Sequence, residues 1–135
     1  MQILLDELQR RDLVARTNLG REYESMTRLF NAFNQRVRNN NLNAQPFEQL
    51  ASQFNDATAQ FRAAYVQYDD SMIKLKDTDC KNKPGDFDAQ LAQTRSLRDA
   101  TEGASTHAAA IAGQYRTQMA QLQSELPSQA AKGAN

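Results

Sequence analysis

The sequence has few of the residues that interrupt helices. It contains 5 glycines and 3 prolines in 135 residues, fewer than a sheet protein with many turns would need. Alanine, glutamine, leucine and arginine are abundant instead, and all four favour helix. This composition predicts an all-α protein.

The chain also lacks a long apolar run and an excess of charge of either sign. Its longest run of large apolar residues is Ile3-Leu4-Leu5, far below the ~20 residues that span a bilayer and below the core of a signal peptide. We therefore expect no integral membrane segment, and no export signal in the chain as given. Sixteen basic residues balance sixteen acidic ones, so no overall field favours nucleic acid or anionic lipid. The predicted partners exclude nucleic acid.

The clearest pattern that is present is a seven-residue repeat of large side chains: Phe47, Phe54, Phe61, Tyr68 and Leu75. Only a helix turns this spacing into one continuous stripe. A single helix would leave the stripe in water, so it must pack against other helices. The repeat predicts a helix over residues 45–76 at the centre of the core.

Similar spacings predict a helix on each side of it, over residues 3–38 and 86–126. Asparagine-rich residues 39–43 separate the first two helices, and residues 77–85, which include Pro84 and Gly85, separate the last two. Pro127 closes the third helix, and the small polar tail 127–135 is predicted to be disordered. Short breaks force neighbouring helices to run antiparallel. The sequence thus predicts one domain, residues 1–126, an up-down-up three-helix bundle with long coiled-coil-like helices.

Folding the chain at residues 43 and 81 predicts which side chains meet. Phe61 falls between Met26 and Thr101, and the small residues 103–110 face the aromatic stripe as a surface of close approach. Gly103 should mark the weakest part of the third helix.

Candidate catalytic and metal-binding residues are few. His107 is the only histidine and lacks a nucleophile and an acid beside it. Four acids surround the second break, but Lys81 and Asn82 stand where an EF-hand needs an oxygen ligand and a glycine. They are predicted to cap and solvate the break; the four are Asp77, Asp79, Asp86 and Asp88.

The other charged positions indicate no catalysis either. Seven arginines on the first helix alternate with acids, which predicts a salt-bridged solvent face. Asp69 and Asp70 point about 100° apart on a helix and cannot face each other. A narrow seam between three helices should hold no cavity of ~300 Å³. We expect no enzyme, cofactor, metal or small-molecule substrate.

Cys80 is the only cysteine, and it could be a free thiol, a buried apolar residue or half of a disulfide. In an antiparallel bundle the loop that holds it lies at the same end as residues 1–4. A cysteine before Met1 would then be within bridging reach.

Three groups of residues carry a resemblance to a family: Arg16-Thr17-Asn18 with Gly20-Arg21 and Tyr23; Tyr68-Asp69-Asp70-Ser71; and Asp79-Cys80-Lys81-Asn82-Lys83-Pro84 with Asp86-Phe87. Together they resemble uncharacterised extracytoplasmic helical proteins of ultrasmall, reduced-genome bacteria, over residues 5–100. In that family a signal peptide precedes a cysteine near the start of the first helix, which would be the partner of Cys80. This chain has neither. The resemblance implies a secreted or surface-attached role.

The expected function is that of a non-enzymatic interaction or structural module, placed outside the cytoplasm, with a protein partner. An intracellular adaptor or a self-associating coiled coil is the alternative, with the alanine-rich face of the third helix as the contact surface. A peripheral membrane binder is a third possibility.

Overall fold

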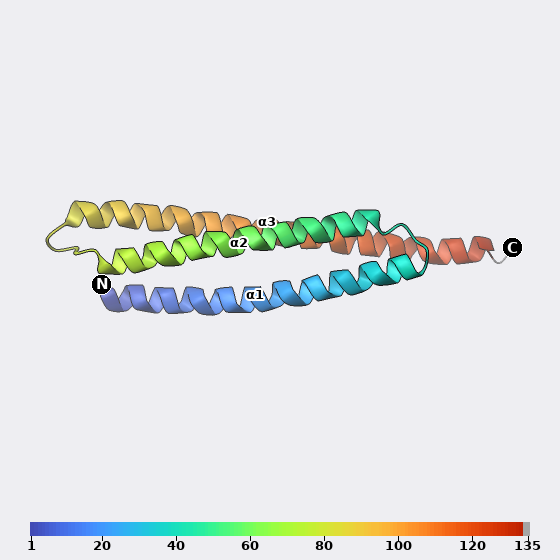
Figure 1. Ribbon diagram of the computed structural model, residues 1–135, viewed down its shortest axis with the longest axis horizontal. Helices are drawn as coiled ribbons and strands as arrows, with labels where there is room; N and C mark the ends of the chain where they lie inside the picture. The colour runs from blue at the N-terminus through green and yellow to red at the C-terminus, as the bar shows by residue number, and fades with distance from the viewer. Residues whose placement is uncertain (134–135) are drawn as a thin grey trace.

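The protein is a bundle of three helices that run up, down and up (Figure 1). The computed structural model describes the backbone of residues 1–133 and the side chains of residues 1–126. The helices are α1 (Gln2–Asn39), α2 (Gln45–Asp77) and α3 (Pro84–Gly133), and no strand occurs within residues 1–133. The predicted all-α antiparallel bundle is confirmed. No helix in the described part of the chain has a stretch apolar enough to cross a membrane.

The turn between α1 and α2 has a backbone conformation that asparagine favours. Asn41 has a positive φ of 57°, in the left-handed region that asparagine tolerates better than most residues. The amide of Asn40 donates to the carbonyl of Arg36 (3.1 Å), and that of Leu42 donates to the carbonyl of Val37 (3.0 Å). These bonds pair carbonyls that a helix end would otherwise leave free.

Both ends of α3 differ from the prediction. The helix begins at Pro84 instead of residue 86, because a proline at the first helical position needs no amide partner. It then continues through Pro127 to Gly133, past the predicted end at residue 126. An internal proline costs roughly 3 kcal/mol, but the residues after it are mostly good helix formers. Of the tail 127–135 that we predict to be disordered, the backbone to Gly133 is thus helical, and Ala134 and Asn135 lie outside the described residues.

α2 is the central element, because it packs along both α1 and α3 while these two approach each other much less. All five members of its seven-residue repeat are buried, with exposed fractions of 4% or less. Several buried positions of α3 carry smaller side chains, among them Thr94, Thr101 and Ala108. The predicted core stripe is therefore confirmed.

The contacts of α1 differ from the predicted register by about one helical turn. Tyr23, three residues before the predicted Met26, packs edge-on against Phe61, with ring centroids 5.5 Å apart, and also against Phe54 at 5.8 Å. Met26 packs against the same core cluster. Phe30 packs edge-on against Phe54 at 5.3 Å. Edge-to-face pairs are favoured arrangements of aromatic rings, so interlocking rings set the offset between α1 and α2.

Gly103 does not make the close approach that the small residues of α3 suggest. A β-carbon added there would meet nothing within 4 Å outside the helix's own backbone. Only part of the run 103–110 faces the core, with Ala108 fully buried and Ala104 partly so, whereas His107 is exposed. Helical periodicity turns most of the run towards solvent.

The burial of Phe61 gives a direct test of the core. Phe61→Ala should lower the free energy of unfolding by ~3–5 kcal/mol, because it removes a buried ring and leaves a cavity. Urea titration followed by circular dichroism measures the change. Val66→Ala, on the same helix but 48% exposed, is the matched control and should change stability little. A loss below about 1 kcal/mol for Phe61→Ala would contradict the core described here.

A second test concerns the open position at Gly103. Gly103→Ala should raise the free energy of unfolding by roughly 0.5–1 kcal/mol, because alanine has fewer unfolded conformations and no atom obstructs its methyl group. The same urea titration measures this. A loss of stability would mean that the glycine is required by packing.

Candidate functional site

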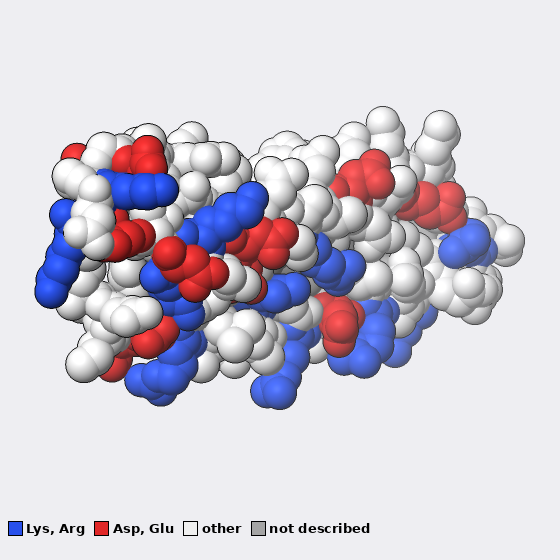
Figure 2. Space-filling view, turned by 60° about the vertical axis from the view of Figure 1, so that its left-hand side comes forward, with Lys and Arg blue, Asp and Glu red and all other residues white. Residues whose placement is uncertain are grey.

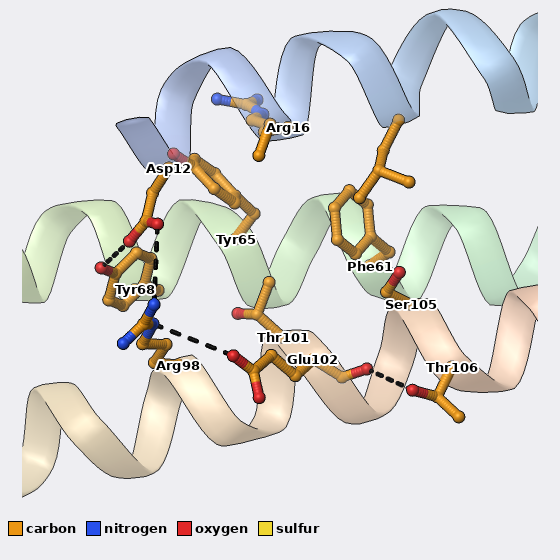
Figure 3. A pocket seen from close by; sticks show the side chains of 12 residues that line it. Asp12, Arg16, Phe61, Tyr65, Tyr68, Arg98, Thr101, Glu102, Ser105 and Thr106 are labelled. Carbon is orange, nitrogen blue, oxygen red and sulfur yellow. Dashed lines mark hydrogen bonds and ion pairs between the residues drawn. The ribbon is translucent and has the colours of Figure 1, made fainter. Parts of the chain in front are cut away.

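A hollow of about 400 Å³ opens between α1 and α3, with α2 behind it (Figure 3). Phe61, Tyr65 and Tyr68 of α2 form its floor. They lie four and three residues apart and so share one face of the helix. The expectation that the seam holds no cavity of ~300 Å³ is wrong. The α2 rings stand between α1 and α3, while the walls carry small residues such as Ala15 and Ser105.

One end of the hollow is closed by a polar chain that joins all three helices (Figure 3). Tyr68 of α2 donates its hydroxyl to Asp12 of α1. The guanidinium of Arg98 on α3 lies 3.8 Å from Asp12 and 3.9 Å from Glu102. Burial raises the pKa of Tyr68, and the hydrogen bond to Asp12 raises it further. The phenol therefore stays protonated and remains a donor at neutral pH.

Tyr65 and Arg16 form a second pair at the same hollow. The Arg16 guanidinium carbon lies 4.4 Å from the centroid of the Tyr65 ring, a cation–π distance. Tyr65 is 3% exposed, and its hydroxyl has no hydrogen-bond partner among the residues whose side chains are described. Burial raises the pKa of Tyr65, and the charges of Asp69 and Asp12 add to this, while Arg16 opposes it. Within residues 1–126, neither the Tyr65 hydroxyl nor the Arg16 guanidinium has a hydrogen-bond acceptor.

The hydroxyl groups of the α3 wall are already engaged. Ser105 shares a hydrogen bond of 3.0 Å with Tyr23 of α1. Thr101 donates to the backbone carbonyl of Leu97 at 2.9 Å, and Thr106 donates to that of Glu102 at 3.0 Å. None of these hydroxyls lies in a nucleophile–base pair of the kind that catalysis uses.

Two further buried polar contacts join helices away from the hollow. Tyr115 of α3 stacks on Phe30 of α1, with centroids 3.8 Å apart, and donates to the carbonyl of Phe30 (2.9 Å) and to Asn34. Burial raises the pKa of Tyr115 to about 12. Between α2 and α3, the hydroxyls of Ser71 and Thr94 lie 2.8 Å apart. These contacts pair polar groups that burial would otherwise penalise.

The sequence candidates for metal binding or catalysis do not come together. His107 is exposed on α3, and no three histidine, cysteine or acidic side chains within residues 1–126 gather as a metal site would need. Asp79 instead accepts hydrogen bonds from the amides of Lys81 (3.0 Å) and Asn82 (3.1 Å). Bonds from Asn82 and Lys81 lower the pKa of Asp79. Asp79 therefore stabilises the turn between α2 and α3.

Asp69 and Asp70 of α2 also have different surroundings. Asp69 accepts a hydrogen bond from the amide of Gln9 on α1 at 2.9 Å, while Asp70 is exposed. Asp69 thus contributes to holding α1 against α2.

Cys80 is exposed and forms no disulfide within the described residues. It lines a hollow at the end of the bundle together with Met1 and Leu5, and Figure 1 places the N-terminus beside the α2–α3 turn. The loop of Cys80 and the start of α1 are therefore neighbours, as an antiparallel bundle requires. A disulfide at Cys80 stays a prediction.

The arginines of α1 form fewer ion pairs than their spacing predicts. Within residues 1–126, Arg10 pairs with Glu7 at 3.3 Å and Arg38 with Glu48 of α2 at 3.1 Å, while the other five have no acidic partner within 4 Å. Figure 2 shows basic and acidic side chains interspersed over one face of the molecule. The surface offers no broad field of one sign on this face.

The buried tyrosines predict a loss of stability in alkali. Tyr115 has a folded-state pKa of about 12, above the ordinary value of about 10, so the folded state holds the phenol proton more tightly. The contribution of this proton to the free energy of unfolding is complete below pH ~10 and is lost as the pH rises towards ~12. Urea titrations between pH 8 and 12 should show this fall. Tyr115→Phe should be less stable at pH 8 but should show a shallower fall, and an unchanged slope would contradict the assignment.

No protein-family model matches the chain, and neither a curated protein nor a solved structure is detectably similar to it. The comparisons therefore support no family assignment. Inference about function depends on the geometry described above.

Proposed function

We propose that the protein is a non-enzymatic interaction module that binds a helical segment of a partner protein along α1. The contact surface is an apolar row on the side of α1 that borders α3, made of Leu4, Leu8, Ala15, Leu19, Met26, Leu29 and Phe33. Apolar residues spaced three, four and seven apart are typical of the contact between two helices. We call it the α1 row.

The exposure of the α1 row carries this proposal. Leu4 and Leu29 are each 68% exposed, although they continue a row whose other leucines pack against the core. Of the nine exposed large apolar side chains within residues 1–126, five lie on α1. Two of these five, Leu4 and Leu29, lie on the α1 row. Exposed apolar groups on one face of a helix suggest an interaction surface more than isolated ones do.

The seam beside the α1 row is open at two places. Ala15 and Leu19 border the hollow between α1 and α3. Phe33 borders another hollow, of about 330 Å³, together with Leu122 and Leu126 of α3. A helix laid along this side would cover both and bury Leu29 between them.

The shape of the molecule also suits a binding role. The chain exposes 9033 Å², whereas a compact monomer of its mass would expose about 7,100 Å². A rod has much surface for its mass. It can therefore offer a long contact without a large domain.

We place the module outside the cytoplasm, as the resemblance to extracytoplasmic helical proteins implies. The lack of a paired nucleophile and base at the hollow supports a role without catalysis. An intracellular adaptor is the alternative for the compartment. Self-association is the alternative for the partner, with a second copy covering the same row.

A photo-crosslinking amino acid at position 29 tests the proposal in the source organism. Crosslinking should yield one defined protein adduct, because the side chain at this position lies in the contact. The same amino acid at Ala63, which is exposed on α2, is the matched control and should yield none. Leu29→Glu should remove the adduct formed from a second crosslinking position at Leu4, while circular dichroism shows an unchanged fold.

Three outcomes would contradict the proposed contact: no adduct at position 29, equal adducts at positions 29 and 63, or an adduct at Leu4 that survives Leu29→Glu. An adduct with a second copy would identify self-association. In that case light scattering should show dimers between micromolar and millimolar concentration.

A further inference from the structure

We propose that the first half of α1, residues 2–19, is an arm that detaches from α2 as one unit while the rest of the bundle stays folded. Gly20 is the hinge between this arm and the second half of the helix. The arm carries the first four members of the α1 row, so its detachment splits the surface proposed for the partner. The arm follows from contacts within the chain, and only its effect on a partner rests on the function proposed above.

The two halves of α1 are buried to different degrees. No side chain of residues 1–22 is buried, and Leu5, Leu8 and Leu19 pack against the core while staying partly exposed. The buried side chains of α1 all lie in its second half: Tyr23, Phe30, Asn34 and Val37. Because burial of apolar surface provides most of the attraction between packed helices, the first half of α1 is held less firmly than the second.

Polar side chains hold the arm against α2. Three of them, spaced three residues apart along α1, each form a hydrogen bond with α2: Asp6 with Lys76, Gln9 with Asp69, and Asp12 with Tyr68. Water competes for such groups, and the side chain of Asp6 is 60% exposed, so contacts of this kind contribute less than apolar burial does. They fix where the arm lies but stabilise it only modestly.

The arm also packs incompletely at both of its ends. The hollow of about 400 Å³ borders it at Ala15 and Leu19 (Figure 3). Another hollow, of about 440 Å³, borders its start at Gln2 and Leu5. Side chains beside a hollow lack neighbours on one side and lose the attraction that these would provide. The arm therefore has little apolar packing to lose when it detaches.

Gly20 lies where the weakly and the firmly held halves of α1 meet. A β-carbon added there would meet nothing within 4 Å outside the helix's own backbone, so packing does not require a glycine. Glycine is among the least favourable residues inside a helix, which makes this the position where α1 is most easily interrupted. A free helix of the arm's length is at best partly helical in water. A detached arm therefore also loses its backbone hydrogen bonds, and amide hydrogen exchange can detect this.

Native-state hydrogen exchange of the whole chain, followed residue by residue with NMR, tests the proposal. The amides of residues 6–19 should share one opening constant, because they open together. This constant should be about tenfold or more above that of residues 26–37, with a step at Gly20. Equal protection of the two ranges would overturn the proposal. So would protection that rises gradually along α1, because simple fraying from the N-terminus produces that pattern.

Two variants alter contacts that the arm loses when it detaches. Gly20→Ala strengthens the helix at the hinge and should slow exchange in the arm by about threefold to fivefold. Tyr68→Phe removes the hydroxyl that donates to Asp12 and should speed exchange in the arm by about threefold or more. Unchanged exchange of the arm in both variants would overturn the proposal.

Gly103→Ala and Tyr115→Phe are the matched controls, because they make the same substitutions at contacts that persist while the arm is detached. Both should change the exchange of residues 26–37, which requires unfolding of the bundle, and leave that of the arm as it is. If either control changes both ranges equally, the arm opens only with the whole bundle and the proposal is overturned. These measurements use the protein alone and leave the α1 crosslinking result unaffected.

Discussion

Burial of the apolar stripe of α2 is the constraint on which the rest of the structure depends. Phe54, Tyr68 and Leu75 are at most 2% exposed, and no single neighbouring helix could cover them all. The stripe therefore requires a helix on each side, which two short turns provide. Because its members are mostly wide rings, it also keeps α1 and α3 from closing on each other. The core that stabilises the bundle thus creates the open side where we place its function.

Polar groups inside the seams decide how the helices align. Asp12 occupies a position that leucines occupy seven residues before and after it, and it meets Tyr68 there. Tyr115 meets Asn34, and Ser71 meets Thr94. Apolar packing alone tolerates sliding, whereas a buried polar group must find its partner or lose a hydrogen bond. These pairs restrict the bundle to one register and orient the hollow.

Several features of α1 and its neighbourhood have no internal role. Leu4 and Leu29 remain exposed, and within residues 1–126 Arg16 has no counter-ion and the Tyr65 hydroxyl has no acceptor. Each is mildly unfavourable for an isolated rod.

The sequence by itself determined the three helices, their antiparallel order, the five core positions of α2 and the asparagine turn. Periodicity and turn chemistry are local properties, so they can be read without coordinates. The polar contact of Asp12 is also indicated by the sequence, because Asp12 stands between Leu5 and Leu19 in a seven-residue apolar repeat. Only the tertiary structure decided that Tyr23 meets Phe61, that Gly103 faces open space, that α3 passes Pro127, and that a hollow exists. A periodic pattern states which face is apolar, but not the distance and offset between helices. Those depend on how side chains from distant segments interlock.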